Sequence, residues 1–193
     1  RTINGLSAKI IEYFSTVYTD ENVPHLMSRE GDRKRLISEV YRLVTGEFAD
    51  TATINDIGAM ITFAKNMMLS DEEIEALSGS GYDTLKIYRE YNLALSSRSL
   101  MDYDDQMVTA LDILRKYPDI LAYFHGRFRY ICVDEAQDTS KIQHEIIRLL
   151  AAKSGNIFMV GDEDQSIYAF RGAYPEALID FEKTYKKIGR ASC

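Results

Sequence analysis

The chain has 193 residues, of which 46% are hydrophobic, so it can bury one substantial core or two small domains that share one. No apolar run approaches the roughly 20 residues that a membrane-spanning helix needs, and the N-terminus has no signal segment, so we expect a cytoplasmic protein without a membrane partner. A net charge of −7 argues against wide contact with a phosphate backbone, while a narrow nucleic-acid site that relies on stacking stays open. The two cysteines, Cys132 and Cys193, are too few for a disulfide framework.

The first two thirds of the chain has helical periodicity. Apolar side chains recur at helical spacing in residues 6–14, 36–44 and 85–95. Thr53 is expected to cap a further helix over residues 54–69. The basic run Arg33-Lys34-Arg35 lies on one of these amphipathic helices, where a solvated face is the favoured interpretation and phosphate contact the alternative.

Two capping patterns are specific enough to place helix starts. Ser70 with Glu73 three residues later predicts a capping box, and Asp102 is expected to cap a helix that Tyr117-Pro118 ends. Asp104 and Asp105 follow Asp102, and we interpret all three carboxylates as acids of a helix N-terminus rather than as metal ligands.

After Gly126 the pattern changes to that of an α/β domain. Residues 130–133 and 157–160 are short apolar runs typical of buried strands, and a helical stripe lies between them at residues 142–150. Two strands joined by a helix predict a parallel βαβ unit. The predicted fold class is therefore α/β, with a large all-helical insertion before this unit.

Acidic residues follow each predicted strand. Asp134 and Glu135 end the first, and Asp162 lies at the end of the second, so both groups are expected at the carboxyl rim where α/β folds bind ligands. An apolar strand that ends in Asp-Glu is the Walker B arrangement, in which the Asp holds Mg²⁺ and the Glu handles the attacking water. The alternative is that these acids merely cap the next helix, with Thr139 as its N-cap.

Two longer motifs favour the first interpretation. Residues 130–139 read YICVDEAQDT and resemble motif II of the UvrD/Rep/PcrA-like superfamily 1 DNA helicases, and residues 160–173 read VGDEDQSIYAFRGA and resemble motif III. Residues 102–105, DYDD, are similar to the DFDD stretch that precedes motif II in that family. The resemblance implies a partial first RecA-like P-loop NTPase (motor) domain from residues 1–19 and 99–193, interrupted by a helical insertion domain at residues 20–98.

The resemblance also implies roles in nucleotide chemistry. Asp134 would bind Mg²⁺, and Glu135 would be the catalytic base for ATP hydrolysis. Gln165 would contact the γ-phosphate and report its presence to the DNA site, with Arg171 helping to couple the two sites. A loop cap is the structural alternative for Gln165.

The same resemblance implies contact with single-stranded DNA and duplex junctions. Tyr168 and Phe170 would stack on bases beside Arg171, although Phe170 stands where the family usually has Trp and offers a smaller ring without an indole N–H. Burial of both rings in the core is the alternative.

One part of an ATP site is missing from the sequence. None of the 11 glycines is followed by Lys, so the Walker A loop is expected upstream of Arg1, with ATP and Mg²⁺ binding only in its presence. We therefore expect a fragment of an ATP-dependent helicase that is inactive alone and that self-associates through its open sheet edge. The alternatives are a non-catalytic interaction module and part of a RecB/AddA-like helicase–nuclease.

Overall fold

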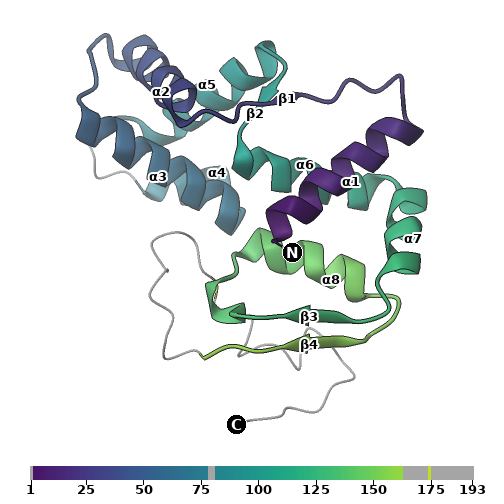
Figure 1. Cartoon of the computed structure of the whole chain (residues 1–193). Helices are drawn as coiled ribbons and strands as arrows, with labels where there is room; N and C mark the ends of the chain where they lie inside the picture. Colours follow the sequence, from purple (N-terminus) through teal and green to yellow (C-terminus); the bar gives the residue numbers. More distant parts are fainter. Residues whose placement is uncertain (1, 78–80, 163–173, 175–193) are drawn as a thin grey trace.

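The computed structural model describes residues 2–77, 81–162 and 174 (Figure 1). In these ranges the chain is mostly helical, with four short strands that form two small parallel sheets. The elements are α1 (Ile3–Val17), β1 (His25–Leu26), α2 (Glu30–Thr45), α3 (Thr51–Met67), α4 (Asp71–Ala76), α5 (Thr84–Ser97), β2 (Leu100–Met101), α6 (Tyr103–Lys116), α7 (Pro118–Arg127), β3 (Ile131–Val133), the 3-10 turn η1 (Ala136–Asp138), α8 (Lys141–Ala151) and β4 (Ile157–Met159).

Side-chain caps fix most helix starts. The capping box of α4 is confirmed, because the Ser70 hydroxyl accepts from Glu73 N while the Glu73 carboxylate accepts from Ser70 N. Asp102 caps α6 as expected, with Oδ1 at 2.7 Å from Asp105 N. The cap expected for α3 was wrong: Asp50 accepts from Thr53 N at 2.7 Å, so the helix begins two residues earlier than Thr53. A carboxylate is the stronger choice there because it also complements the positive end of the helix dipole.

The expected stop at Tyr117-Pro118 is confirmed for α6, which ends at Lys116. The sequence prediction nevertheless missed the next helix, because Pro118 begins α7 directly. Proline is well tolerated at the first helical position, where its missing N–H would have had no partner in the helix. The same residue thus ends one helix and starts the next.

The predicted βαβ unit is confirmed as a parallel pair. Ile131, Cys132 and Val133 of β3 pair in register with Ile157, Phe158 and Met159 of β4, and α8 connects the two strands. Helix α8 lies along one face of this pair, where Ile147 and Ala151 pack against the strand residues Val133 and Ile157 (Figure 1). This packing places the ends of both strands at one rim.

A second parallel pairing was not predicted. Strands β1 and β2 hold two residues each, with His25 opposite Leu100 and Leu26 opposite Met101. The backbone bonds from His25 N to Ser99 O and from Met27 N to Met101 O, both 2.8 Å long, extend this ladder. The chain therefore leaves for α2–α5 and returns from them along adjacent paths (Figure 1).

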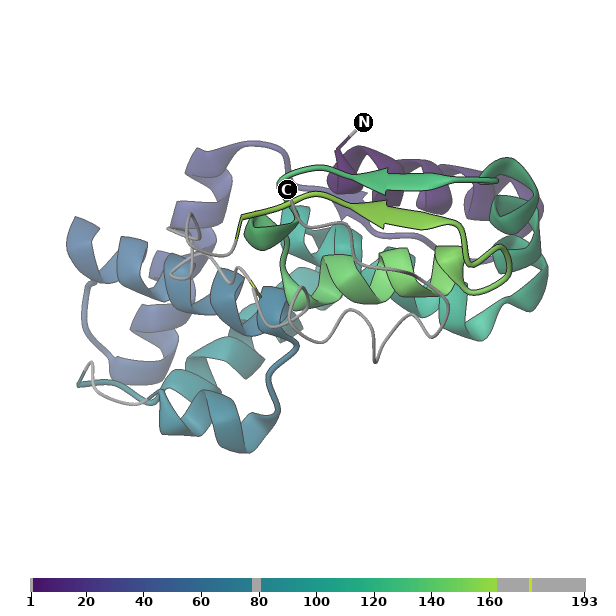
Figure 2. The same cartoon turned by 90° about the horizontal axis from the view of Figure 1, so that it is seen from below.

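Within residues 2–77 and 81–162, the buried apolar side chains gather into three clusters. One joins α1, α6, α7 and α8, and it includes Ile10, Phe14, Leu111 and Ile146. A second joins α2, α3 and α5, which together with α4 we term the helical body. The third lies between β3, β4 and α8. Figure 2 shows the helical body beside the layer formed by α8 and the strand pair.

Candidate functional site

The two carboxylates of motif II stand at the carboxyl end of β3. Asp134 and Glu135 are both exposed, and Asp134 Oδ1 accepts from Glu135 N at 3.1 Å. Glu135 has φ 49° and ψ 45°, in the left-handed region that non-glycine residues seldom occupy. Met68 and Ser99 share this positive φ, at 53° and 52°, so in this chain the conformation marks sharp turns. The strand thus ends in a sharp turn that presents the Glu135 side chain at the rim.

The side-chain amide of Gln137 binds the Glu135 carboxylate. Its Nε2 donates to Glu135 Oε2 at 2.6 Å, and its Oε1 accepts from Asp162 N at 3.1 Å. Only 2% of Gln137 is exposed. Both ends of one buried amide are therefore used, one on the motif II acid and the other on the first residues of motif III.

Backbone bonds fasten the same turn to the end of β4. Val160 N donates to Val133 O, and Ala136 N donates to Val160 O, both at 2.8 Å. Ala136 is fully buried in the apolar cluster between β3, β4 and α8. The start of motif III is consequently fixed against the motif II turn by main-chain contacts as well as by Gln137.

Thr139 closes the turn rather than capping α8. Its hydroxyl donates to Ala136 O at 2.6 Å, and the N-cap of α8 is Ser140, whose backbone N–H donates to Gln143 Oε1 at 3.2 Å. The alternative in which Thr139 caps the helix was therefore wrong. A hydroxyl has a single proton, so the bond between Thr139 Oγ1 and His144 Nε2 requires the imidazole to donate.

His144 is buried beneath this turn. Burial lowers the pKa of His144 from its ordinary 6.5 to about 4, against the smaller opposing effects of Ala136 O and Glu145. The ring is therefore neutral near pH 7, with the proton on Nε2. An imidazole in this state acts as a fixed hydrogen-bond donor to Thr139.

The segment that carries most of the proposed motif III residues lies outside the described part. Gln165, Tyr168, Phe170 and Arg171 all fall in residues 163–173. The next described residue, Tyr174, returns to the motif II turn, because its N–H donates to Thr139 O at 2.9 Å. Of the predicted site residues, the structure thus brings Asp134 and Glu135 together at the rim and leaves the roles of the other four as predictions.

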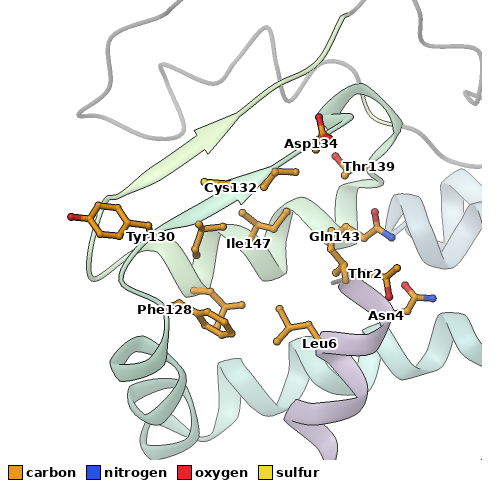
Figure 3. Close-up of a pocket in the computed structure, with 14 residues that line it drawn as sticks. Thr2, Asn4, Leu6, Phe128, Tyr130, Cys132, Asp134, Thr139, Gln143 and Ile147 are labelled. Carbon is orange, nitrogen blue, oxygen red and sulfur yellow. The ribbon is translucent and has the colours of Figure 1, made fainter.

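A groove of about 850 Å³ runs beside β3 (Figure 3). Asp134 and Thr139 lie at one end of it, and Phe128 and Tyr130 lie at the other. Within residues 2–77 and 81–162, β3 pairs only with β4, so the groove follows the strand edge that has no partner there. Its floor is mainly apolar and includes Leu6 and Ile147.

A second polar cluster joins the helical body to the start of α6. Lys65 Nζ lies 3.0 Å from Asp102 Oδ2 and 2.6 Å from Asp105 Oδ1, and Tyr91 Oη donates to Asp102 at 2.9 Å. Burial opposes charge on Asp102, but Lys65 and the Asp105 N–H hold the pKa of that carboxyl below its usual value. Burial raises the pKa values of Asp104 and Asp105.

Arg33 belongs to this cluster and not to a solvated face. Its Nη2 donates to Gly58 O at 3.0 Å and to Thr62 Oγ1 at 2.9 Å, so the favoured interpretation of the basic run was wrong for Arg33. Thr62 in turn donates to Asp104 Oδ2 at 2.8 Å. The DYDD carboxylates are thus occupied by cations and donors of the protein itself. Sequence reasoning missed Lys65, because the residue sits 37 positions from its carboxylate partner with no local pattern to mark it.

The rim offers few protein ligands for a metal ion. In the described residues no three His, Cys, Asp or Glu side chains form a cage for a metal ion. Mg²⁺ is usually held by one or two carboxylates together with water and phosphate oxygens, so the exposed carboxylate of Asp134 provides a suitable ligand.

Among the helices of the described ranges, none is both long and apolar enough to cross a bilayer.

Comparison with known families adds to this geometry. The sequence pattern of the family described as UvrD/REP helicase N-terminal domain matches residues 1–186, almost the whole chain. This chain belongs to that family. The structure is mostly helical with small parallel sheets, which is consistent with part of such a domain. Of the predicted α/β fold, the parallel βαβ unit is confirmed.

Relatives of this UvrD/REP helicase segment include larger proteins. The chain is 39% identical over 116 residues to the ATP-dependent DNA helicase PcrA of Staphylococcus aureus. The aligned region covers 60% of this chain and 16% of that protein. It is 37% identical over 154 residues to PcrA of Leuconostoc citreum (79% and 20%), and 32% identical over 184 residues to YjcD of Bacillus subtilis (95% and 24%). The chain therefore spans between 16% and 24% of the length of these relatives.

Proposed function

We propose that this chain forms part of the first motor domain of an ATP-dependent DNA helicase, which couples ATP hydrolysis to translocation on single-stranded DNA and to duplex unwinding. The observation that carries the proposal is the rim at the end of β3. There Asp134 and Glu135 stand exposed, and a buried glutamine holds Glu135 on a strained turn. Family membership and the similarity to the two PcrA proteins support it.

In the proposed mechanism the two carboxylates have separate tasks. Asp134 would hold Mg²⁺, which when bound neutralises negative charge on the phosphate oxygens. Glu135 would orient the attacking water and accept its proton. The position of Glu135 at the rim and its bond to Gln137 keep a carboxylate oxygen fixed, as this task requires. The chain has no glycine-lysine pair, so the Walker A loop that cradles the phosphates would have to come from another segment.

The proposed domain division has support in the packing. The helical body has its own apolar cluster, and residues 20–98 would form the insertion, while residues 1–19 and 99–193 would form the RecA-like part. We further propose that Gln165 and Arg171 connect the nucleotide with DNA, and that Tyr168 and Phe170 stack on bases. Tyr174 N, bonded to Thr139 O, would bring the end of motif III back to the motif II turn.

The test uses a full-length helicase that contains this chain. Glu135→Gln should leave binding of Mg-ATP nearly intact in titration calorimetry and should cut DNA-stimulated kcat by roughly 10²–10⁴-fold, because only the base is removed. The matched control is Glu145→Gln on α8, where the carboxylate pairs with Arg148 and Arg115 at the surface. The control should retain kcat. Wild-type turnover by Glu135→Gln would assign the base elsewhere, and a wild type without DNA-stimulated ATPase would favour the non-catalytic module.

A further inference from the structure

Gln137 is the least exposed polar side chain of the motif II turn, at 2% exposure. It lies in the middle of the η1 turn between Ala136 and Asp138, and its amide reaches both the Glu135 carboxylate and the Asp162 N–H. Because both ends of this buried amide are hydrogen-bonded, the amide connects the end of β3 to the end of β4. In the sequence, Gln137 is marked only by its place within motif II.

The orientation of this amide is fixed by its partners. An ionised carboxylate can only accept, and a backbone N–H can only donate, so Nε2 must face Glu135 and Oε1 must face Asp162. Glutamate at this position could still accept from Asp162 N but would repel Glu135. Methionine, of similar length, would make neither bond. Glutamine is thus the side chain that satisfies both partners at this length.

Among the described residues, the Gln137 amide makes the hydrogen bond that restrains the Glu135 carboxylate. The residue is exposed and has a flexible side chain, although its backbone is held at φ 49°. A hydrogen bond to an ionised group is shorter and about twice as strong as one between neutral groups. The 2.6 Å bond from Gln137 therefore selects one position of the carboxylate, and a general base works only when its oxygen lies within reach of the proton it takes.

The other end of the amide connects this position to motif III. Asp162 lies two residues after Val160, whose N–H and C=O are bonded to Val133 and Ala136, and directly before residues 163–173. A displacement of the chain at Asp162 must either move the Gln137 amide or break its bond. The amide group is planar and rigid, so a displacement of Oε1 also displaces Nε2.

We propose that Gln137 is a positioning residue that holds Glu135 in its catalytic place and passes the state of motif III to it. The proposal rests on the assignment of Glu135 as the base in the proposed function. It assigns to Gln137 two separable effects. The bond to Glu135 sets the level of turnover, and the bond to Asp162 makes that level depend on what the segment after Asp162 has bound.

The experiment separates these effects with two substitutions in a full-length helicase that contains this chain. Gln137→Met removes both bonds, so DNA-stimulated kcat should fall by roughly 10–100-fold with little change in the KM for ATP, and the ratio of DNA-stimulated to basal kcat should fall toward one. Gln137→Glu keeps the acceptor for Asp162 N, so kcat should fall in both conditions while the ratio stays near that of the wild type.

Gln143→Met is the matched control. It makes the same change of side chain close by in the sequence and removes the bond to Ser140 N at the start of α8, but it does not touch Glu135. Urea unfolding of all three variants provides the comparison of stability. The control should lose stability and keep both kcat and the stimulation ratio.

The outcomes distinguish the inference from the function on which it rests. If Gln137→Met has wild-type kcat and ratio while Glu135→Gln is inactive, the inference is overturned and the base stands. If Gln137→Met and Gln143→Met lose kcat equally, Gln137 acts only through stability, and the inference is overturned as well. If Glu135→Gln retains full turnover, the proposed function of the site fails first.

Discussion

Lowering the pH should destabilise this chain through His144. The folded state favours the neutral ring, because burial lowers the pKa of His144 from 6.5 to about 4. A base whose pKa is lower in the folded state gives its full contribution above pH 6.5 and loses it as the pH falls toward 4, because the unfolded chain takes up the proton first. At about pH 5 this difference in proton uptake corresponds to a loss of about 2 kcal/mol, and the loss approaches about 3 kcal/mol at lower pH.

Other groups titrate in the opposite sense, so the measurement must isolate the imidazole. Burial raises the pKa values of Asp104 and Asp105, and their protonation therefore stabilises the folded state as the pH falls. His144→Gln keeps a donor within reach of the Thr139 hydroxyl but cannot titrate. The difference in unfolding free energy between wild type and His144→Gln removes the carboxylate contribution common to both.

The assay is urea unfolding followed by far-ultraviolet circular dichroism at about pH 7.5 and about pH 5. The wild type should lose about 2 kcal/mol relative to His144→Gln between the two pH values. An equal difference at both would refute the reasoning, because it would mean that His144 titrates alike in the folded and unfolded chains. A wild type that gains stability relative to the variant at the lower pH would reverse the sign of the argument.

The remaining predictions test other parts of the molecule. Lys65→Met leaves the buried carboxylates around Asp102 without their closest cation and should cost about 3–5 kcal/mol in urea unfolding, whereas unchanged stability would show that the ion pairs contribute nothing. In the full-length helicase, Tyr168→Ala or Phe170→Ala should weaken binding of single-stranded DNA by roughly 10–100-fold in fluorescence anisotropy, and the loss should persist at high salt because stacking is neutral; wild-type affinity in both would place the DNA elsewhere. The isolated chain should release no phosphate from ATP, and in light scattering it should self-associate through the edge of β3 that has no partner within the described residues. Turnover or a strict monomer would contradict these expectations.

Local sequence patterns predicted the elements whose determinants are local. The capping box at Ser70, the cap at Asp102 and the stop at Tyr117 each depend on residues within one helical turn. The parallel βαβ unit followed from two apolar runs and a helical stripe, and it placed Asp134 and Glu135 correctly at the end of β3. The chemistry of a strand end is readable in the sequence because its residues are consecutive.

The features that sequence missed depend on contacts between distant segments. Lys65 is buried against Asp102, the N-cap of α6, and no local pattern in α3 distinguishes it from a solvated lysine. The β1–β2 pairing has two residues per strand, too short for an alternating pattern. Gln137 gains its meaning only when the end of β4 is placed beside it. In each case the partner, and not the residue itself, carries the information.

The pairing of β1 with β2 has a consequence for how the helical body can vary. Its two connections to the rest of the chain lie one strand spacing apart, about 4.8 Å. A body attached through two adjacent crossings can be enlarged, shortened or exchanged without stretching the fold that carries it, since the distance between the attachment points stays the same. The segment between β1 and β2 is a loop of about 70 residues, and the entropy cost of closing such a loop grows only with the logarithm of its length. The same two-strand ribbon and the ion pairs of Lys65 and Arg33 with Asp102 together attach the body to the start of α6.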